Sequence, residues 1–201
     1  MLARSLLLPA VLLAAVATAA PTTIDDVRAA LKATTTMTAA FTQTAANGGV
    51  VTGKLLLARP GRIRFQYDKA PLLVVADGKR LSVVDYEVAQ VSQWPIKSTP
   101  LGVLLDSDAD LARFAHVTGV TANGVLVEAR DAGHPEYGAI TLTFVHDAAA
   151  PGGLSLSGWT ALDAQNNRTE VALTSVRYNV AVQGSSFAFR DPRAHGLPGK
   201  N

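Results

Sequence analysis

The residues Arg62-Ile63-Arg64-Phe65-Gln66-Tyr67 alternate polar and apolar side chains without a break. Successive side chains of a β-strand point to opposite faces, so this period of two predicts a strand with one wet face and one apolar face. Pro60-Gly61 separates it from the apolar run before it, and a further apolar run follows at residues 72–76. Short strands joined by tight turns are typical of an antiparallel sheet.

The same signals recur along most of the chain. Asn47-Gly48-Gly49, Asp77-Gly78 and Asn123-Gly124 are hairpin turn sequences. Strands are predicted at residues 37–46, 50–59, 62–67, 72–76, 79–85 and 88–93, again from Phe114 onward, and at 137–146, 154–162, 168–179 and 187–189. No helices alternate with these strands, which favours one mainly antiparallel β domain without internal repeats.

Helices are predicted at two places. Thr23 and Asp26 form a capping box, and Ile24, Val27 and Leu31 share one face of the helix that follows. Pro95 and Pro100 punctuate a second region, in which residues 101–105 form a compact apolar, helix-like run. Residues 106–108 could cap a further short helix around Leu111.

The first nineteen residues resemble a secretory signal. A short positive end at residues 1–4 precedes the apolar residues 6–17, and Ala17-Thr18-Ala19 fits a cleavage site of small residues. We therefore predict a signal peptide at 1–19 and a single domain at 20–201. The alternative, an uncleaved membrane anchor, is disfavoured because the apolar run is short for a membrane span.

Composition excludes several functions. The chain has no cysteine and a formal net charge of +2, so a thiolate metal site, a cysteine nucleophile and a nucleic-acid footprint are not expected. The four histidines are scattered, and neither Gly153-Leu-Ser155-Leu-Ser157-Gly158 nor Asp106-Ser-Asp108-Ala-Asp110 completes a catalytic or calcium-binding motif. We predict no catalytic residues, no metal and no cofactor.

The apolar strand faces leave two architectures open. The sheet could pack on itself as a sandwich, or it could curve and keep an apolar concave face for a ligand. Composition does not distinguish the two.

A resemblance to a known family favours the second architecture. The stretch from Leu57-Ala-Arg59-Pro60-Gly61 through Tyr67 resembles the signature of the periplasmic lipoprotein carrier family, LolA. Phe41-Thr-Gln43, Val75-Ala-Asp77-Gly78-Lys79, Thr99-Pro100-Leu101 and Phe187-Ala-Phe189 resemble further family segments in the same order. The resemblance covers nearly all of residues 20–201.

The resemblance implies a fold and a site. The fold is mainly β with short helices: an incomplete antiparallel β-barrel, or half-barrel, with an α-helical lid over an apolar cavity. It implies that Val27 and Leu31 belong to the first lid helix, and Leu101 and Leu104 to the second. Arg59 is expected to hydrogen-bond lid carbonyls as a latch. The acyl-chain cavity is expected to be lined by Met37, Phe41, Leu55, Leu57, Ile63, Phe65 and Tyr67.

The implied function is that of a monomeric, non-enzymatic carrier in the periplasm. It would take lipoproteins by their acyl chains from an inner-membrane release complex and deliver them to the outer membrane, where a separate lipoprotein receptor could act. Two alternatives stay open: a related periplasmic half-barrel that binds another hydrophobic ligand or senses stress, and a periplasmic enzyme.

Overall fold

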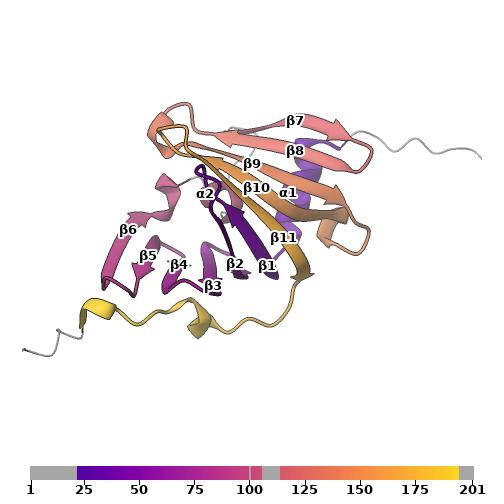
Figure 1. The fold of residues 1–201 in the computed structure, drawn as a ribbon. Helices are drawn as coiled ribbons and strands as arrows, with labels where there is room; N and C mark the ends of the chain where they lie inside the picture. The colour runs from indigo at the N-terminus through magenta and orange to yellow at the C-terminus, as the bar shows by residue number, and fades with distance from the viewer. Residues whose placement is uncertain (1–21, 100, 106–113, 195–201) are drawn as a thin grey trace, which may run out of the picture.

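The computed structural model describes residues 22–99, 101–105 and 114–194, which include a curved antiparallel sheet (Figure 1). Eleven strands pair in the order β6-β5-β4-β3-β2-β1-β11-β10-β9-β8-β7. The first group is β1 (Thr36–Thr44), β2 (Val50–Ala58), β3 (Arg62–Tyr67), β4 (Leu72–Asp77), β5 (Arg80–Asp85) and β6 (Gln90–Pro95). The second is β7 (Ala115–Thr121), β8 (Gly124–Arg130), β9 (Ala139–His146), β10 (Leu154–Leu162) and β11 (Arg168–Tyr178).

Each group is a meander of neighbouring strands, and the two groups meet where β1 pairs with β11. Met37 lies opposite Tyr178 at this seam, although they are far apart in the sequence. The order ends at β6 on one side and β7 on the other, so the sheet is open. The predicted half-barrel is therefore confirmed, and the predicted strand over residues 62–67 coincides with β3.

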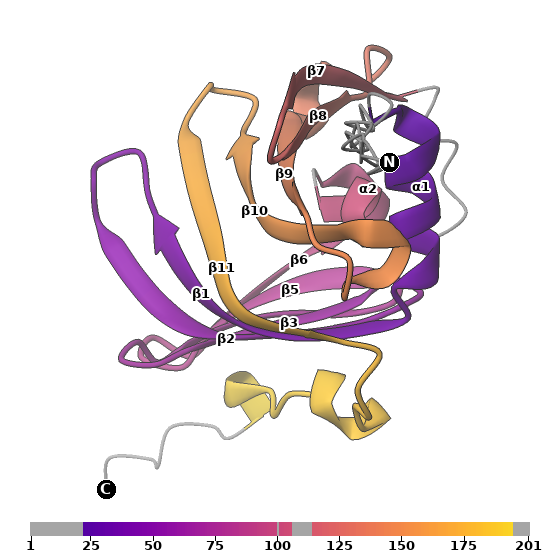
Figure 2. The same cartoon turned by 90° about the vertical axis from the view of Figure 1, so that its right-hand side faces the viewer.

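Two helices lie on the concave side of the sheet (Figure 2). The first, α1 (Ile24–Ala33), begins at the predicted capping box, since the Thr23 hydroxyl accepts from the Asp26 N–H and the Asp26 carboxylate accepts from the Thr23 N–H. The second, α2 (Leu101–Leu105), follows the short 3₁₀ helix η1 (Ile96–Ser98). The signal peptide predicted at 1–19 and the helix predicted around Leu111 lie outside the described residues.

Side chains on the two faces of the sheet form separate clusters. The main core fills the concave side and joins the sheet to Val27, Ala30 and Leu31 of α1. The smaller cluster lies on the convex side of β4 and β5, where Leu73, Val75 and Val84 surround Phe187. The prediction of a strand at residues 187–189 is wrong, because Phe187 ends the 3₁₀ helix η4 (Gly184–Phe187) and packs onto a sheet face instead of pairing with a strand edge.

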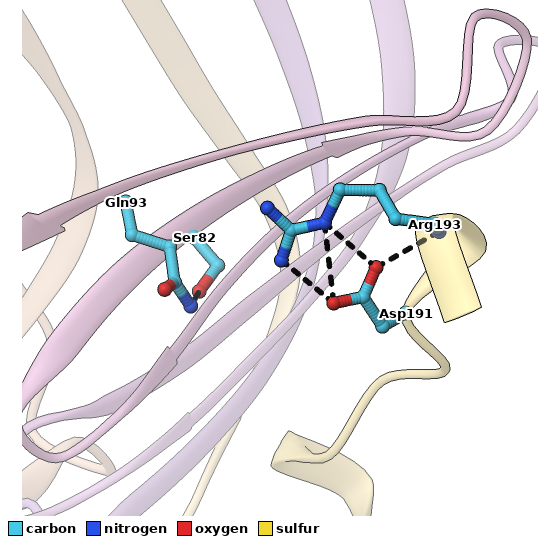
Figure 3. A network of polar contacts seen from close by, with 4 residues as sticks. All are labelled: Ser82, Gln93, Asp191 and Arg193. Carbon is cyan, nitrogen blue, oxygen red and sulfur yellow. Dashed lines mark hydrogen bonds and ion pairs between the residues drawn. The ribbon is translucent and has the colours of Figure 1, made fainter.

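The C-terminal segment runs along this convex side. Arg64 donates from Nη1 to the carbonyls of Ser186 (3.2 Å) and Ala188 (3.1 Å), and the Arg62 guanidinium lies 5.4 Å from the Phe187 ring centroid. Beyond it, η5 (Pro192–Ala194) lies near β6, and its Arg193 forms an ion pair of 2.7 Å with Asp191 (Figure 3). The segment thus covers the convex face of β3 to β5. Two further 3₁₀ turns, η2 (Pro135–Tyr137) and η3 (Pro151–Gly153), lie in connecting loops.

Candidate functional site

An apolar cavity lies between α1 and the concave face of the sheet. It is lined by Ala30, Leu31, Thr34, Met37, Leu57, Arg59, Phe144, Leu154, Leu156 and Tyr178. Its free volume is about 10 Å³, which is room for roughly one water molecule. An acyl chain could enter this space only if the elements around it moved apart, because the free volume is far too small for it.

Helix α1, which forms one wall of the cavity, is fixed at its C-terminal end by Asn179. The Asn179 side-chain oxygen accepts from the Thr35 N–H (2.9 Å) and hydroxyl (3.0 Å), and its amide donates to the Ala33 carbonyl (3.1 Å). Helix ends leave carbonyls such as that of Ala33 without helical partners, so Asn179 both caps α1 and ties it to the end of β11.

The same helix is also held along its side. A Cβ atom added to Gly152 would lie 2.8 Å from the Ala30 Cα, and Gly152 adopts a φ of +67°. Glycine therefore permits a backbone contact between α1 and the loop from β9 to β10 that a larger residue would prevent.

Helix α2 also contacts the main core and the turn after β2. Leu105 is buried in the main core and Leu101 is half-buried against it. The Gly61 N–H, in the turn after Arg59, donates to the Leu105 carbonyl at 3.1 Å. The backbone of the predicted lid residue Leu104 lies in α2, and its side chain lies outside the described residues.

Four aromatic rings of the main core pack against one another. The Phe41 centroid lies 5.4 Å from that of Phe65 and 5.3 Å from that of Tyr67, and Phe65 lies 6.0 Å from Trp159, all in edge-on contact. Gly53 makes room for Phe41, since an added Cβ would lie 2.6 Å from the ring. Burial raises the pKa of Tyr67, whose hydroxyl donates to Gln43 Oε1 at 2.9 Å, so the ring stays neutral at physiological pH.

Arg59 carries the charged group of the cavity wall. It is half-buried, and its backbone N–H donates to the Thr35 carbonyl at 2.8 Å. Leu57 and Arg59 both line the cavity, as their spacing of two along the chain requires. In the same turn, the Gly61 N–H donates to the Leu105 carbonyl of α2 at 3.1 Å.

The structure brings the sequence-predicted residues together on one face. Met37, Phe41, Leu55, Leu57, Ile63, Phe65 and Tyr67 are all buried in the main core, together with Val27 and Leu31 of α1. Of these, Leu31, Met37 and Leu57 line the cavity directly, with Arg59. Sequence reasoning missed the contribution of β9 to β11, namely Phe144, Leu154, Leu156, Tyr178 and the neighbouring Trp159; the alternation Leu154-x-Leu156 was the available signal.

The described part of the chain contains no group of three or more His, Cys, Asp or Glu side chains placed to hold a metal ion. Within the same residues, no helix has the length and apolar character needed to cross a membrane.

The described chain is therefore an open antiparallel half-barrel with helices over an apolar concave face. The sequence profile of the outer membrane lipoprotein carrier protein family, LolA, matches residues 32–190, and the chain belongs to this family.

Two bacterial proteins with similar sequences agree with that assignment. The chain is 28% identical over 181 residues to the outer-membrane lipoprotein carrier protein of Chromobacterium violaceum, covering 85% of this chain and 84% of the relative. It is 26% identical over 179 residues to the corresponding protein of Pseudomonas syringae pv. tomato, covering 81% of each. A solved LolA superfamily structure from Nitrosomonas europaea aligns with a TM-score of 0.45 at 9% identity, over 85% of this chain and 99% of that one.

Proposed function

We propose that this protein is a periplasmic, non-enzymatic carrier that shields the acyl chains of lipoproteins between the inner and outer membranes. The observation that carries the proposal is the closed apolar cavity beneath α1, continuous with a concave face of buried aliphatic and aromatic side chains. The relatives named as outer-membrane lipoprotein carriers support the choice of ligand.

The physical need for such a carrier follows from the cost of wetting acyl chains. Each buried CH₂ contributes about 0.8 kcal/mol, so a chain of about 15 methylenes resists transfer to water by on the order of 12 kcal/mol. A concave apolar face can cover such a chain. A cavity that closes when empty also competes with the ligand, which lowers the apparent affinity and helps release.

Arg59 is the proposed latch of the closed form. Arg59 lines the cavity, and its turn also supplies the Gly61 N–H that contacts α2. A planar cation that keeps its charge suits a contact that must form and break without a change of protonation. The proposed partners are the lipoprotein cargo, an inner-membrane release complex and, at the other end of the route, an outer-membrane receptor.

The test is a release assay with inner-membrane vesicles that carry a radiolabelled lipoprotein. We expect wild-type protein to bring label into a soluble complex that passes it on to outer membranes. Leu31→Glu places a carboxylate in the cavity wall and should lower the yield of complex at least about tenfold, because an unpaired charge against acyl chains is costly.

Ala29→Glu is the matched control, since it adds the same side chain at an exposed position of α1. Equal complex yield from the two variants, with both folded by circular dichroism, would show that the cavity is not the ligand site. Recovery of a different hydrophobic ligand from purified protein, with no lipoprotein complex, would favour a related half-barrel of another function.

A further inference from the structure

A row of apolar side chains crosses the concave face from the cavity to the open edge of the sheet. Strand pairing places its members opposite one another on six consecutive strands, and directly opposed residues share a face. The row is Met37, Leu57, Ile63, Ala76, Leu81 and Trp94, from β1 to β6. Met37 and Leu57 line the cavity, so the row begins in the ligand site itself.

Exposure changes abruptly at the outer end of this row. The first four members are at most 1% exposed and Leu81 is 8% exposed, whereas Trp94 is 46% exposed. Trp94 lies on the edge strand β6, which carries no charged residue, and on the same face as Leu81 of the main core. A large aromatic side chain exposed at the end of a buried apolar row is unusual, because edge strands commonly carry charges that deter contact.

The opposite end of the row is closed by stronger contacts. Met37 lies opposite Tyr178, whose hydroxyl accepts from the Leu156 N–H at 2.8 Å and so joins β11 to β10. Above it lies α1, which Asn179 and the Ala30–Gly152 contact hold in place. Opening on this side would break several specific contacts at once.

On the β6 side, the described elements over the concave face are η1 and α2. Strand β6 leads directly into η1 and α2, and the Ile96 N–H donates to the Lys79 carbonyl at 3.0 Å beside Trp94. Ile96 and Leu105 both belong to the main core, so η1 and α2 cover the concave face next to this edge. Displacing α2 would uncover the row near its outer end while α1 stays fixed.

We propose that acyl chains pass into and out of the cavity at the β6 edge, beside α2, and that Trp94 contacts the part of the chain nearest the lipoprotein polypeptide. The proposal rests on the carrier function and specifies where the same site opens. Tryptophan suits this place because it combines a large apolar surface with a polar N–H that tolerates water.

The row of apolar side chains is long enough to cover an acyl chain. Neighbouring strands lie about 4.8 Å apart, so the five steps from Met37 to Trp94 span about 24 Å. One acyl chain extends through half of a bilayer core of about 30 Å, or roughly 15 Å. The row can therefore cover the full length of a chain whose far end reaches the cavity and whose head stays at the edge.

The test uses the two tryptophans as reporters. The probe is a peptide with a diacylglyceryl cysteine whose palmitoyl chains carry bromine, which quenches tryptophan on contact, either near the carbonyl or near the methyl end. Subtracting the emission of Trp94→Phe from that of wild-type protein isolates Trp94 and leaves the buried Trp159 untouched. We expect carbonyl-end bromine to quench Trp94 much more strongly than methyl-end bromine does. Trp159, whose ring lies 6.0 Å from Phe65 of β3, reports that an acyl chain occupies the concave face.

Quenching of Trp159 with no effect of either probe on Trp94 would overturn the proposed port while leaving the carrier function intact. No quenching of either residue, with no cosedimentation of probe and protein, would overturn both.

A kinetic measurement gives a second, independent check. Trp94→Glu should slow association of the acylated peptide at least about fivefold, whereas Val145→Glu, at a 38% exposed position of β9 on the opposite face, should not. Equal association rates for the two variants would contradict the port.

Discussion

Replacement of Asn179 offers a direct test of how firmly α1 is attached. The residue follows β11 and adopts a φ of +53°, a left-handed conformation that asparagine tolerates better than most residues. Its side chain accepts two hydrogen bonds from Thr35 and donates one to Ala33, at distances between 2.9 and 3.1 Å. In Asn179→Ala all three bonds are lost while the backbone conformation has to persist.

The expected loss can be worked out from these contacts. A net contribution of about 0.5–1.5 kcal/mol per hydrogen bond, taken at the lower half of that range because the site is exposed, gives about 2 kcal/mol for three bonds. A left-handed alanine adds roughly 1–2 kcal/mol of backbone strain. If the bonds act mainly on α1, protection of its amides should fall about 30-fold from the lost bonds alone, since 1.4 kcal/mol corresponds to a factor of ten.

Asn166 supplies the matched control. It has a φ of +61° in the turn between β10 and β11, so Asn166→Ala incurs the same backbone strain at a site remote from α1. Urea unfolding and hydrogen exchange of both variants separate the two effects. Equal destabilisation of the two proteins, with α1 protection unchanged, would refute the role of Asn179 in attaching α1.

Three further outcomes are expected. In ligand-free protein, hydrogen exchange should be faster at the amides of residues 101–105 than at those of residues 140–144. The reason is that α2 is one short helix, whereas β9 is paired with a strand on each side. Equal protection of the two segments would count against a movable α2. The Arg59→Leu variant should accept lipoprotein but pass it to outer membranes more slowly, so that the soluble complex accumulates. Release of lipoprotein at the wild-type rate would show that Arg59 has no part in the mechanism. The backbone N–H groups of Arg80 and Lys79 donate hydrogen bonds to the Asp77 carboxylate and hold its pKa below the usual value. The ionised carboxylate therefore stabilises the fold above about pH 4, and this stabilisation is lost as the pH falls through the lowered pKa. The Asp77→Asn variant should therefore unfold at a lower urea concentration than wild type at pH 7, and the two unfolding midpoints should approach each other near pH 3. A difference between the midpoints that does not change with pH would show that ionised Asp77 does not stabilise the fold.

The sequence predicted local elements well because local patterns determine them. The alternation at residues 62–67 defined β3, and the Thr23–Asp26 capping box marked the start of α1. The error at residues 187–189 has a physical explanation. Phe187 and its neighbours are apolar because they pack on the convex face of the sheet, and apolar spacing alone does not show whether a partner is a strand edge or a sheet face.

The candidate site was predicted in part for a related reason. The cavity residues on α1, β1 and β2 follow from local periodicity and from the family resemblance. Phe144, Leu154, Leu156 and Tyr178 reach the same cavity through the pairing of β1 with β11 and of β10 with its neighbours. Such long-range pairing is not encoded in a period of two. The alternation Leu154-x-Leu156 therefore shows that these side chains share a face, but not that this face reaches the cavity.

The seam between β1 and β11 also governs how the chain can reach its folded state. Met37 and Tyr178 pair across most of the domain, and no other strand joins the two groups within the described sheet. Contacts so distant in sequence are slow to form, and proteins dominated by them fold on a timescale of about milliseconds to seconds. A chain that stops before Arg168 could form both meanders but would have no strand to bridge them. Assembly of the interior must therefore wait for the last strand, and until then both meanders expose the apolar faces that later enclose the ligand.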